Sequence, residues 1–184
     1  MQFQRYTLIY KSQEQINRIE SADFSVFENQ DLKIEFLLED AEDGKRYQTV
    51  VQQKNKIELV DFFIETKIDY SNTNDIFCNG FQSWTETKLF NKTEKLKAQR
   101  RGIKAIGEAY GDGLFYSYKN KKGVVHSFTY TYIKLPKRRI LFLGSLNDAI
   151  GYTIFEHHAN ENKLIIKKDC EGLIIENCTT LLDF

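Results

Sequence analysis

The chain has 184 residues, of which 41% are hydrophobic, 14% aromatic and 28% charged. This length suits one domain with a substantial core, and this composition excludes intrinsic disorder. Lysine and arginine total 26, as do aspartate and glutamate, so the formal net charge is zero. The balance excludes a global electrostatic attraction to nucleic acid or to an anionic membrane, and we expect neither as a partner.

Residues 1–15 contain no apolar run of the kind found in secretory signals, and no later stretch is long enough for a membrane span. We therefore expect a cytoplasmic protein. Its cysteines, Cys78, Cys170 and Cys178, show no Cys-x-x-Cys spacing, so reduced thiols are expected. A Cys170–Cys178 bridge across a hairpin is the alternative.

Strand-forming residues recur in short runs through the first part of the chain. Apolar and polar residues alternate between 32 and 38, the period of a half-buried strand. The apolar set on its inner face is Leu32, Ile34, Phe36 and Leu38. From 57 to 70 the apolar phase changes between Leu59 and Val60, which predicts a β-bulge or a bend there.

The next stretch, IFCNGFQSWT at 76–85, contains the one tryptophan of the chain. Asn-Gly between two apolar runs predicts a two-residue hairpin turn, because both residues tolerate positive φ. The polar side chains that follow, beside a large indole, also indicate a recognition loop; packing of the indole in the core is the alternative. The candidate site residues are Asn79, Gly80, Gln82, Ser83 and Trp84.

The segment near 86–105 interrupts the strand pattern, because it shows no period of two. We expect a short helix or an irregular crossing loop there. Its basic residues have only Phe90 as a nearby aromatic, so a solvated loop or docking surface is favoured over a nucleic-acid site. These basic residues are Lys92, Lys95, Lys97, Arg100, Arg101 and Lys104.

Strand patterns resume after residue 123. Residues 124–135 alternate as one strand, with the aromatic set on one face and hydroxyl residues on the other. The aromatic set is Phe128, Tyr130 and Tyr132, against Ser127, Thr129 and Thr131. Short strands are expected at 138–145, 151–158, 162–169, 172–177 and 179–184. Residues 1–184 are thus predicted to form a single all-β domain, a large antiparallel β-sandwich.

No pattern of catalytic or metal-binding residues stands out. His157 and His158 are adjacent on an expected strand, so their side chains point to opposite faces and do not readily share a metal with His126. The chain has no nucleophile elbow, and the glycines of 107–113 lack the Lys-Ser/Thr ending of a phosphate loop. We expect no metal, no cofactor and no catalytic residue.

Several stretches, in order, resemble a known family. FCNGFQSWTET at 77–87 is similar to the Asn-Gly-aromatic-Gln-Ser-Trp signature in the N-terminal domains of α-galactosidases of glycoside hydrolase family 36 and related raffinose-processing enzymes. HSFTYTYIKL at 126–135 resembles the family's His-Ser-aromatic strand. Residues 142–156 and 162–173 resemble its Gly-Ser-Leu, Gly-Tyr-Thr and Asp-x-x-Gly pieces, and TTLLDF looks like its closing strand. Residues 1–75 match only in β character.

The resemblance implies an N-terminal β-supersandwich of a multidomain retaining α-galactosidase. Catalysis would belong to a (β/α)8 barrel expected after residue 184, so the chain alone is expected to be inactive and to pack on that barrel. Gln82, Ser83 and Trp84 would lie where the two domains meet, near a galactoside or oligosaccharide, and the partners that the resemblance implies include a second copy of the chain in a homo-oligomer. A free-standing carbohydrate-binding β-sandwich and a purely structural interaction domain are the alternatives.

One run imitates the family's nucleophile motif. Lys167-Lys168-Asp169 fits its Lys-x-Asp start, but the family has Asn two residues after the Asp, where this chain has Glu171. Residues 169–172 are typical of a β-turn, with Asp and Gly in the usual places. We therefore assign no catalytic role to Asp169.

Overall fold

The computed structural model describes residues 1–73, 75–80, 86–95, 122–170, 172–175 and 177–184, together with Ala105 and Ala109. Within these ranges the chain forms antiparallel β-sheets and a short 3₁₀-helix, η1 (Ala159–Glu161), which confirms the expected all-β sandwich. None of the described residues belongs to a helix long and apolar enough to cross a membrane.

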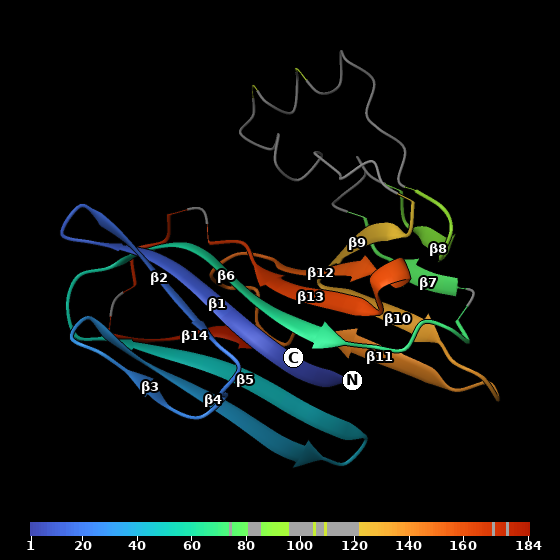
Figure 1. Ribbon diagram of the computed structural model, residues 1–184, viewed down its shortest axis with the longest axis horizontal. Helices are drawn as coiled ribbons and strands as arrows, with labels where there is room; N and C mark the ends of the chain where they lie inside the picture. The colour runs from blue at the N-terminus through green and yellow to red at the C-terminus, as the bar shows by residue number, and fades with distance from the viewer. Residues whose placement is uncertain are drawn as a thin grey trace.

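The described strands form three sheets (Figure 1). Sheet A has the order β2 (Gln15–Ser21), β1 (Gln2–Ser12), β6 (Glu58–Lys67), β13 (Lys163–Lys168), β12 (Thr153–His158) and β9 (Val124–Phe128). Sheet B has the order β14 (Cys178–Asp183), β5 (Gly44–Gln53), β4 (Leu32–Ala41) and β3 (Phe27–Glu28). Sheet C has the order β11 (Ile140–Gly144), β10 (Tyr130–Lys134), β7 (Asp75–Cys78) and β8 (Lys88–Asn91).

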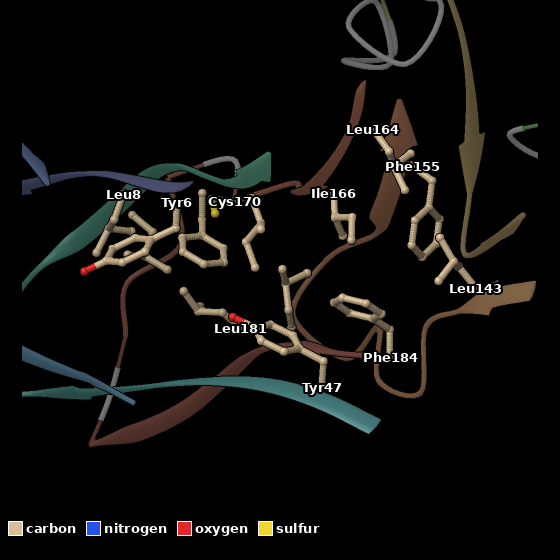
Figure 2. Close-up of a cluster of buried hydrophobic side chains, with 14 of the residues drawn as sticks. Tyr6, Leu8, Tyr47, Leu143, Phe155, Leu164, Ile166, Cys170, Leu181 and Phe184 are labelled. Atoms are coloured by element: carbon tan, nitrogen blue, oxygen red, sulfur yellow. The ribbon is translucent and has the colours of Figure 1, made fainter. Parts of the chain in front are cut away.

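Sheet A packs on both smaller sheets through one continuous core. Toward sheet B, the rings of Tyr6 on β1 and Phe36 on β4 lie 4.6 Å apart between centroids. Figure 2 shows the centre of this core, where Phe155 of β12 meets Phe184 just after β14, with Leu143 of β11 beside Phe155. All three sheets therefore contribute to a single apolar interior, whose burial is the main favourable term in folding.

The predicted β-bulge is confirmed. In the pairing of β1 with β6, Ile9 lies opposite Asp61 and Tyr10 lies opposite Leu59, so Val60 is the extra residue. Leu59 and Phe62 are both fully buried, whereas Val60 is 38% exposed. One inserted residue thus restores the apolar face to the core on both sides of the phase change.

The prediction of one strand over 124–135 is wrong. Thr129 has φ 66° and separates β9 of sheet A from β10 of sheet C. The buried face of β10 carries Thr131, while Tyr130 and Tyr132 lie on its outer face. The hydroxyl residue of β10 is thus the buried one, and the Thr131 hydroxyl donates to the carbonyl oxygen of Phe77 at 2.6 Å, so burial leaves no unpaired polar group.

Other boundaries also differ from the sequence-based expectation. Residues 88–91, expected to be irregular or helical, form β8, because they pair with β7; the rest of 86–105 lies largely outside the described residues. Of the expected strand 172–177, the described residues 172–175 and 177 form no strand, and Ile174 makes an isolated bridge with Glu58. Leu38 is 57% exposed, because the end of β4 pairs with β5 alone and its last residues are uncovered.

The turn near Asp169 is shifted by one residue. The Leu173 N–H donates to the Cys170 carbonyl at 2.7 Å, and Gly172 has φ +76°. The hydrogen bond therefore joins residues 170 and 173, one residue later than the predicted turn at 169–172, and the positive φ falls on Gly172 because only glycine adopts that conformation freely.

A fully buried histidine connects sheet A to sheet C. His157 of β12 lies 2.8 Å from the Tyr70 hydroxyl through Nδ1 and 2.8 Å from the Thr131 hydroxyl through Nε2. The single proton of Thr131 is donated to the Phe77 carbonyl, so Nε2–H must donate to Thr131 and Nδ1 must accept from Tyr70. The ring is neutral, since burial lowers the pKa of His157 to about 3.

Acidification should destabilise the fold through His157. Its pKa is about 3 in the folded protein and roughly 6.5 in the unfolded chain, so the unfolded state binds more protons between those values. The free energy of unfolding should fall by roughly 1 kcal/mol per pH unit below about pH 6.5. Urea unfolding of the wild type and His157→Gln at about pH 7 and about pH 5 measures this term. Equal slopes for the wild type and His157→Gln would refute the assignment.

Candidate functional site

Asn79 lies at the end of β7, where the candidate stretch begins. The prediction of a two-residue hairpin at Asn79-Gly80 is wrong, because β7 and β8 pair with Cys78 opposite Lys88 and residues 79–87 connect them. Asn79 instead bonds to the end of β9. Its N–H donates to Ser127 Oγ at 2.6 Å, its Nδ2 donates to the Phe128 carbonyl at 3.0 Å, and its own carbonyl accepts from the Phe128 N–H at 3.0 Å.

These bonds override the local turn preference of Asn-Gly. Asn79 continues β7 alongside the edge strand of sheet A, so the chain does not reverse at this point. Gly80 then donates its N–H to Thr87 Oγ1 at 2.9 Å, which joins the two ends of the 79–87 connection. Both ends of the candidate stretch are therefore held by the sandwich, while Gln82, Ser83 and Trp84 lie outside the described residues.

Ser127 and Thr129 fix the passage from sheet A to sheet C. The buried Ser127 hydroxyl accepts a hydrogen bond from the Asn79 N–H and donates one to the Tyr130 carbonyl at 2.5 Å. The hydroxyl is therefore used both as a donor and as an acceptor within the protein. The Thr129 N–H donates to the Thr153 carbonyl at 2.8 Å, and its carbonyl accepts from the Ser145 N–H at 2.6 Å. The backbone break at Thr129 is thus tied to the loop between β11 and β12.

Asp148 organises that loop. Its Oδ1 accepts from the Ser145 hydroxyl at 2.8 Å and from the N–H of Thr153 at 3.0 Å. Lys168 of β13 lies with its Nζ 3.7 Å from the same oxygen and donates to the Asn147 carbonyl at 3.3 Å. The Lys168 side chain is fully buried; desolvation lowers its pKa, and the Asp148 carboxylate opposes that shift.

Gly151 brings the Gly-Tyr-Thr stretch against the Asp-x-x-Gly stretch. Its φ is +118°, and a Cβ at this position would lie under 3.0 Å from the Asp169 carbonyl oxygen. The Asp169 N–H donates to the Tyr152 carbonyl at 3.0 Å, so the two segments are bonded through the backbone. This contact explains why position 151 is a glycine. It also shows that the Asp169 backbone has a structural role, since it joins the two segments.

We call these residues the anchor network: Asn79, Ser127, Thr129, Ser145, Asp148, Thr153 and Lys168. Its members come from the family-like stretches 77–87, 126–135, 142–156 and 162–173, and the fold brings these four stretches into contact; the closing stretch 179–184 supplies none of them. Each hydroxyl and carboxylate described above has partners inside the protein, so the network is suited to positioning and not to chemistry. Only Asn79 was a candidate from sequence. The rest carried no signal beyond their place inside the family-like stretches.

The histidines and cysteines of the described residues are not arranged as a metal site. No group of three or more His, Cys, Asp or Glu among the described residues is arranged to hold a metal ion. Cys78 and Cys170 are buried thiols, Cys178 is exposed, and no Cys170–Cys178 bridge forms. Burial raises the pKa of Cys170 to about 12, which keeps that thiol protonated.

Comparison with known proteins does not assign a family. The chain matches no protein-family model and no curated protein.

The close approach of Asp169 to Gly151 predicts that substitutions at Gly151 and at Gly44 have very different effects on stability. Gly151→Ala should lower the free energy of unfolding by more than ~2 kcal/mol, because the methyl group meets the Asp169 carbonyl in a strained backbone conformation. Gly44→Ala is the matched control, since its Cβ would have nothing within 4 Å; it should change stability by less than ~1 kcal/mol. Denaturant unfolding measures both, and equal losses would show that the Gly151–Asp169 contact is unimportant.

Proposed function

We propose that this chain is the non-catalytic N-terminal domain of an α-galactosidase-like glycoside hydrolase of the cytoplasm. In this proposal it packs on a (β/α)8 catalytic barrel of the same polypeptide. The observation that carries the proposal is the anchor network, because the family-like stretches that are separate in sequence contact one another in the fold. Similarities that arise by chance have no reason to converge, whereas motifs inherited with a shared fold do.

The proposed role of the network is to hold the ends of residues 79–87. Asn79 is bonded to both Ser127 and Phe128, and Gly80 is bonded to Thr87, so the stretch between them starts from a fixed base. The sequence places Gln82, Ser83 and Trp84 in that stretch. We assign them contacts with the barrel or with a galactoside, since an indole face stacks on the apolar face of a sugar while amides and hydroxyls bond its hydroxyl groups.

A free-standing carbohydrate-binding sandwich is favoured less by the geometry of sheet C. Its outer face carries exposed aromatic residues, but the rings of Phe77 and Tyr132 stack on each other at 4.8 Å with 3° between planes. Tyr130 also stacks on Phe77, at 5.7 Å and 17°. These rings cover one another's faces, and sugar stacking requires a free face. The residues are better suited to a protein contact.

Reading the gene beyond the codon for Phe184 tests the proposed function. We expect an in-frame barrel with the family's catalytic aspartates, and hydrolysis of an aryl α-galactoside by the longer polypeptide but not by residues 1–184 alone. A stop codon directly after Phe184 would contradict the proposal. So would turnover by the 184-residue chain that is lost in Asp169→Asn.

Truncation of Trp84 distinguishes an interface residue from a core residue. Trp84→Ala should cost the isolated chain ~1 kcal/mol or less, because its proposed partner surface belongs to another domain. Phe62→Ala, which removes a fully buried ring, is the comparison and should cost ~3–5 kcal/mol. Denaturant unfolding gives both values. If Trp84→Ala lowers the free energy of unfolding as much as Phe62→Ala does, the indole is a core residue and not an interface residue.

A further inference from the structure

Strand β11 leaves one side of sheet C open. It pairs with β10 and with no other described strand. The Ser145 N–H bonds to the Thr129 carbonyl and the Leu135 N–H bonds to the Arg139 carbonyl, which sets the alternation of the ladder between the two strands. By that alternation the backbones of Leu141 and Leu143 face β10. The N–H and C=O groups of the other three residues, Ile140, Phe142 and Gly144, point away from the sheet.

The chemistry of β11 suits pairing with another strand. Its sequence, ILFLG, contains no charged residue and no proline, and Ile140 and Phe142 are each 60% exposed. The edge strands β2 and β8 carry exposed charges that discourage strand addition, Arg18 in β2 and Lys88 in β8. The edge strand β9 is bonded at Phe128 to Asn79. An uncharged, apolar edge is a site of strand pairing.

Side chains on the outer face continue up to this edge. Phe142, Tyr132, Phe77 and Leu89 lie opposite one another on four successive strands. A Cβ at Gly144 would lie 2.8 Å from the ring of Phe142, so that ring lies over the glycine, where it stacks on Tyr130 with 6.3 Å between centroids. The apolar row therefore ends in an exposed ring at the open side of the sheet.

We propose that β11 pairs with β11 of a second copy of this chain, antiparallel about a twofold axis at Phe142. The three residues with outward backbone groups are centred on Phe142, so such an axis places Phe142 opposite its symmetry mate and Ile140 opposite Gly144 of the second copy. Every outward N–H then meets an outward C=O, and each isoleucine lies beside a glycine instead of another bulky side chain. The two copies of sheet C become one sheet, and the apolar row continues through the junction.

This self-complementarity selects a second copy over an unrelated peptide. An arbitrary strand would satisfy the same backbone groups, but its side chains have no fixed relation to Ile140 and Gly144. The pairing does not depend on the proposed function, since it uses only sheet C. The β11–β11 pairing would be the interface of the homo-oligomer that we expected from the family resemblance.

Sedimentation of the 184-residue chain over a wide concentration range tests the pairing. We expect a reversible dimer. Phe142→Lys should raise its dissociation constant at least about 100-fold, because a lysine at the twofold axis faces its own symmetry mate. Leu89→Lys is the matched control. It adds the same charge in the same row at the opposite edge of sheet C, where Leu89 is 37% exposed, and should change the constant by less than about 3-fold.

Amide exchange separates strand pairing from any other dimer. The amides of Ile140, Phe142 and Gly144 should be protected in the concentrated wild type and fast in Phe142→Lys, while those of Leu141 and Leu143 stay protected in both and report an intact fold. A chain that is monomeric at every concentration would overturn the proposal. So would a dimer in which the three outward amides exchange rapidly, or one that Leu89→Lys disrupts as strongly as Phe142→Lys.

Discussion

The arrangement of the sheets depends on the buried imidazole of His157. It belongs to sheet A, yet both of its nitrogens are bonded to residues outside that sheet, Tyr70 and Thr131. The chain of hydrogen bonds runs in one direction only, from the Tyr70 hydroxyl through the ring and Thr131 to the backbone carbonyl of Phe77, because a carbonyl only accepts. A neutral ring satisfies every member, whereas a charged ring would leave a buried Nδ1–H facing Tyr70. His157 thus connects sheet A to sheet C by hydrogen bonds through the core.

The anchor network lies next to the end of this chain of hydrogen bonds. The chain ends at the Phe77 carbonyl, and Asn79, two residues later, is a member of the network. Phe77 lies on β7 and Asn79 follows directly after that strand, so the hydrogen bonds of His157 hold the strand and the network holds the residue that leaves it. Burying Lys168 is costly, and its neighbours Asp148 and Asn147 offset that cost by charge and by a hydrogen bond. A polar network this enclosed is a means of fixing loop positions. Asn79 belongs both to this network and to the candidate stretch, which is why we connect the network with presentation of residues 79–87.

The sequence predicted what depends on side-chain period and missed what depends on long-range partners. The bulge at Val60 was visible because one extra residue shifts every following apolar side chain to the other face. The break at Thr129 was not, because the hydroxyl of Thr131 takes an inward position that only a carbonyl on another strand makes acceptable. The Asn-Gly turn failed for a related reason: bonds from Asn79 to β9 outweigh a local preference. Asp148 and Lys168 belong to one site only after the fold brings β13 beside the loop before β12.

The most direct test of the central claim is the protonation of His157 observed by ¹⁵N NMR of the imidazole. The account predicts a neutral ring with its proton on Nε2 and an acceptor-type Nδ1, unchanged from about pH 7 to about pH 5, since the pKa of His157 is about 3. A proton on Nδ1 would reverse the direction of the hydrogen-bond chain. A ring that becomes charged near pH 6, as a solvent-exposed histidine does, would show that the two sheets are not joined by this residue.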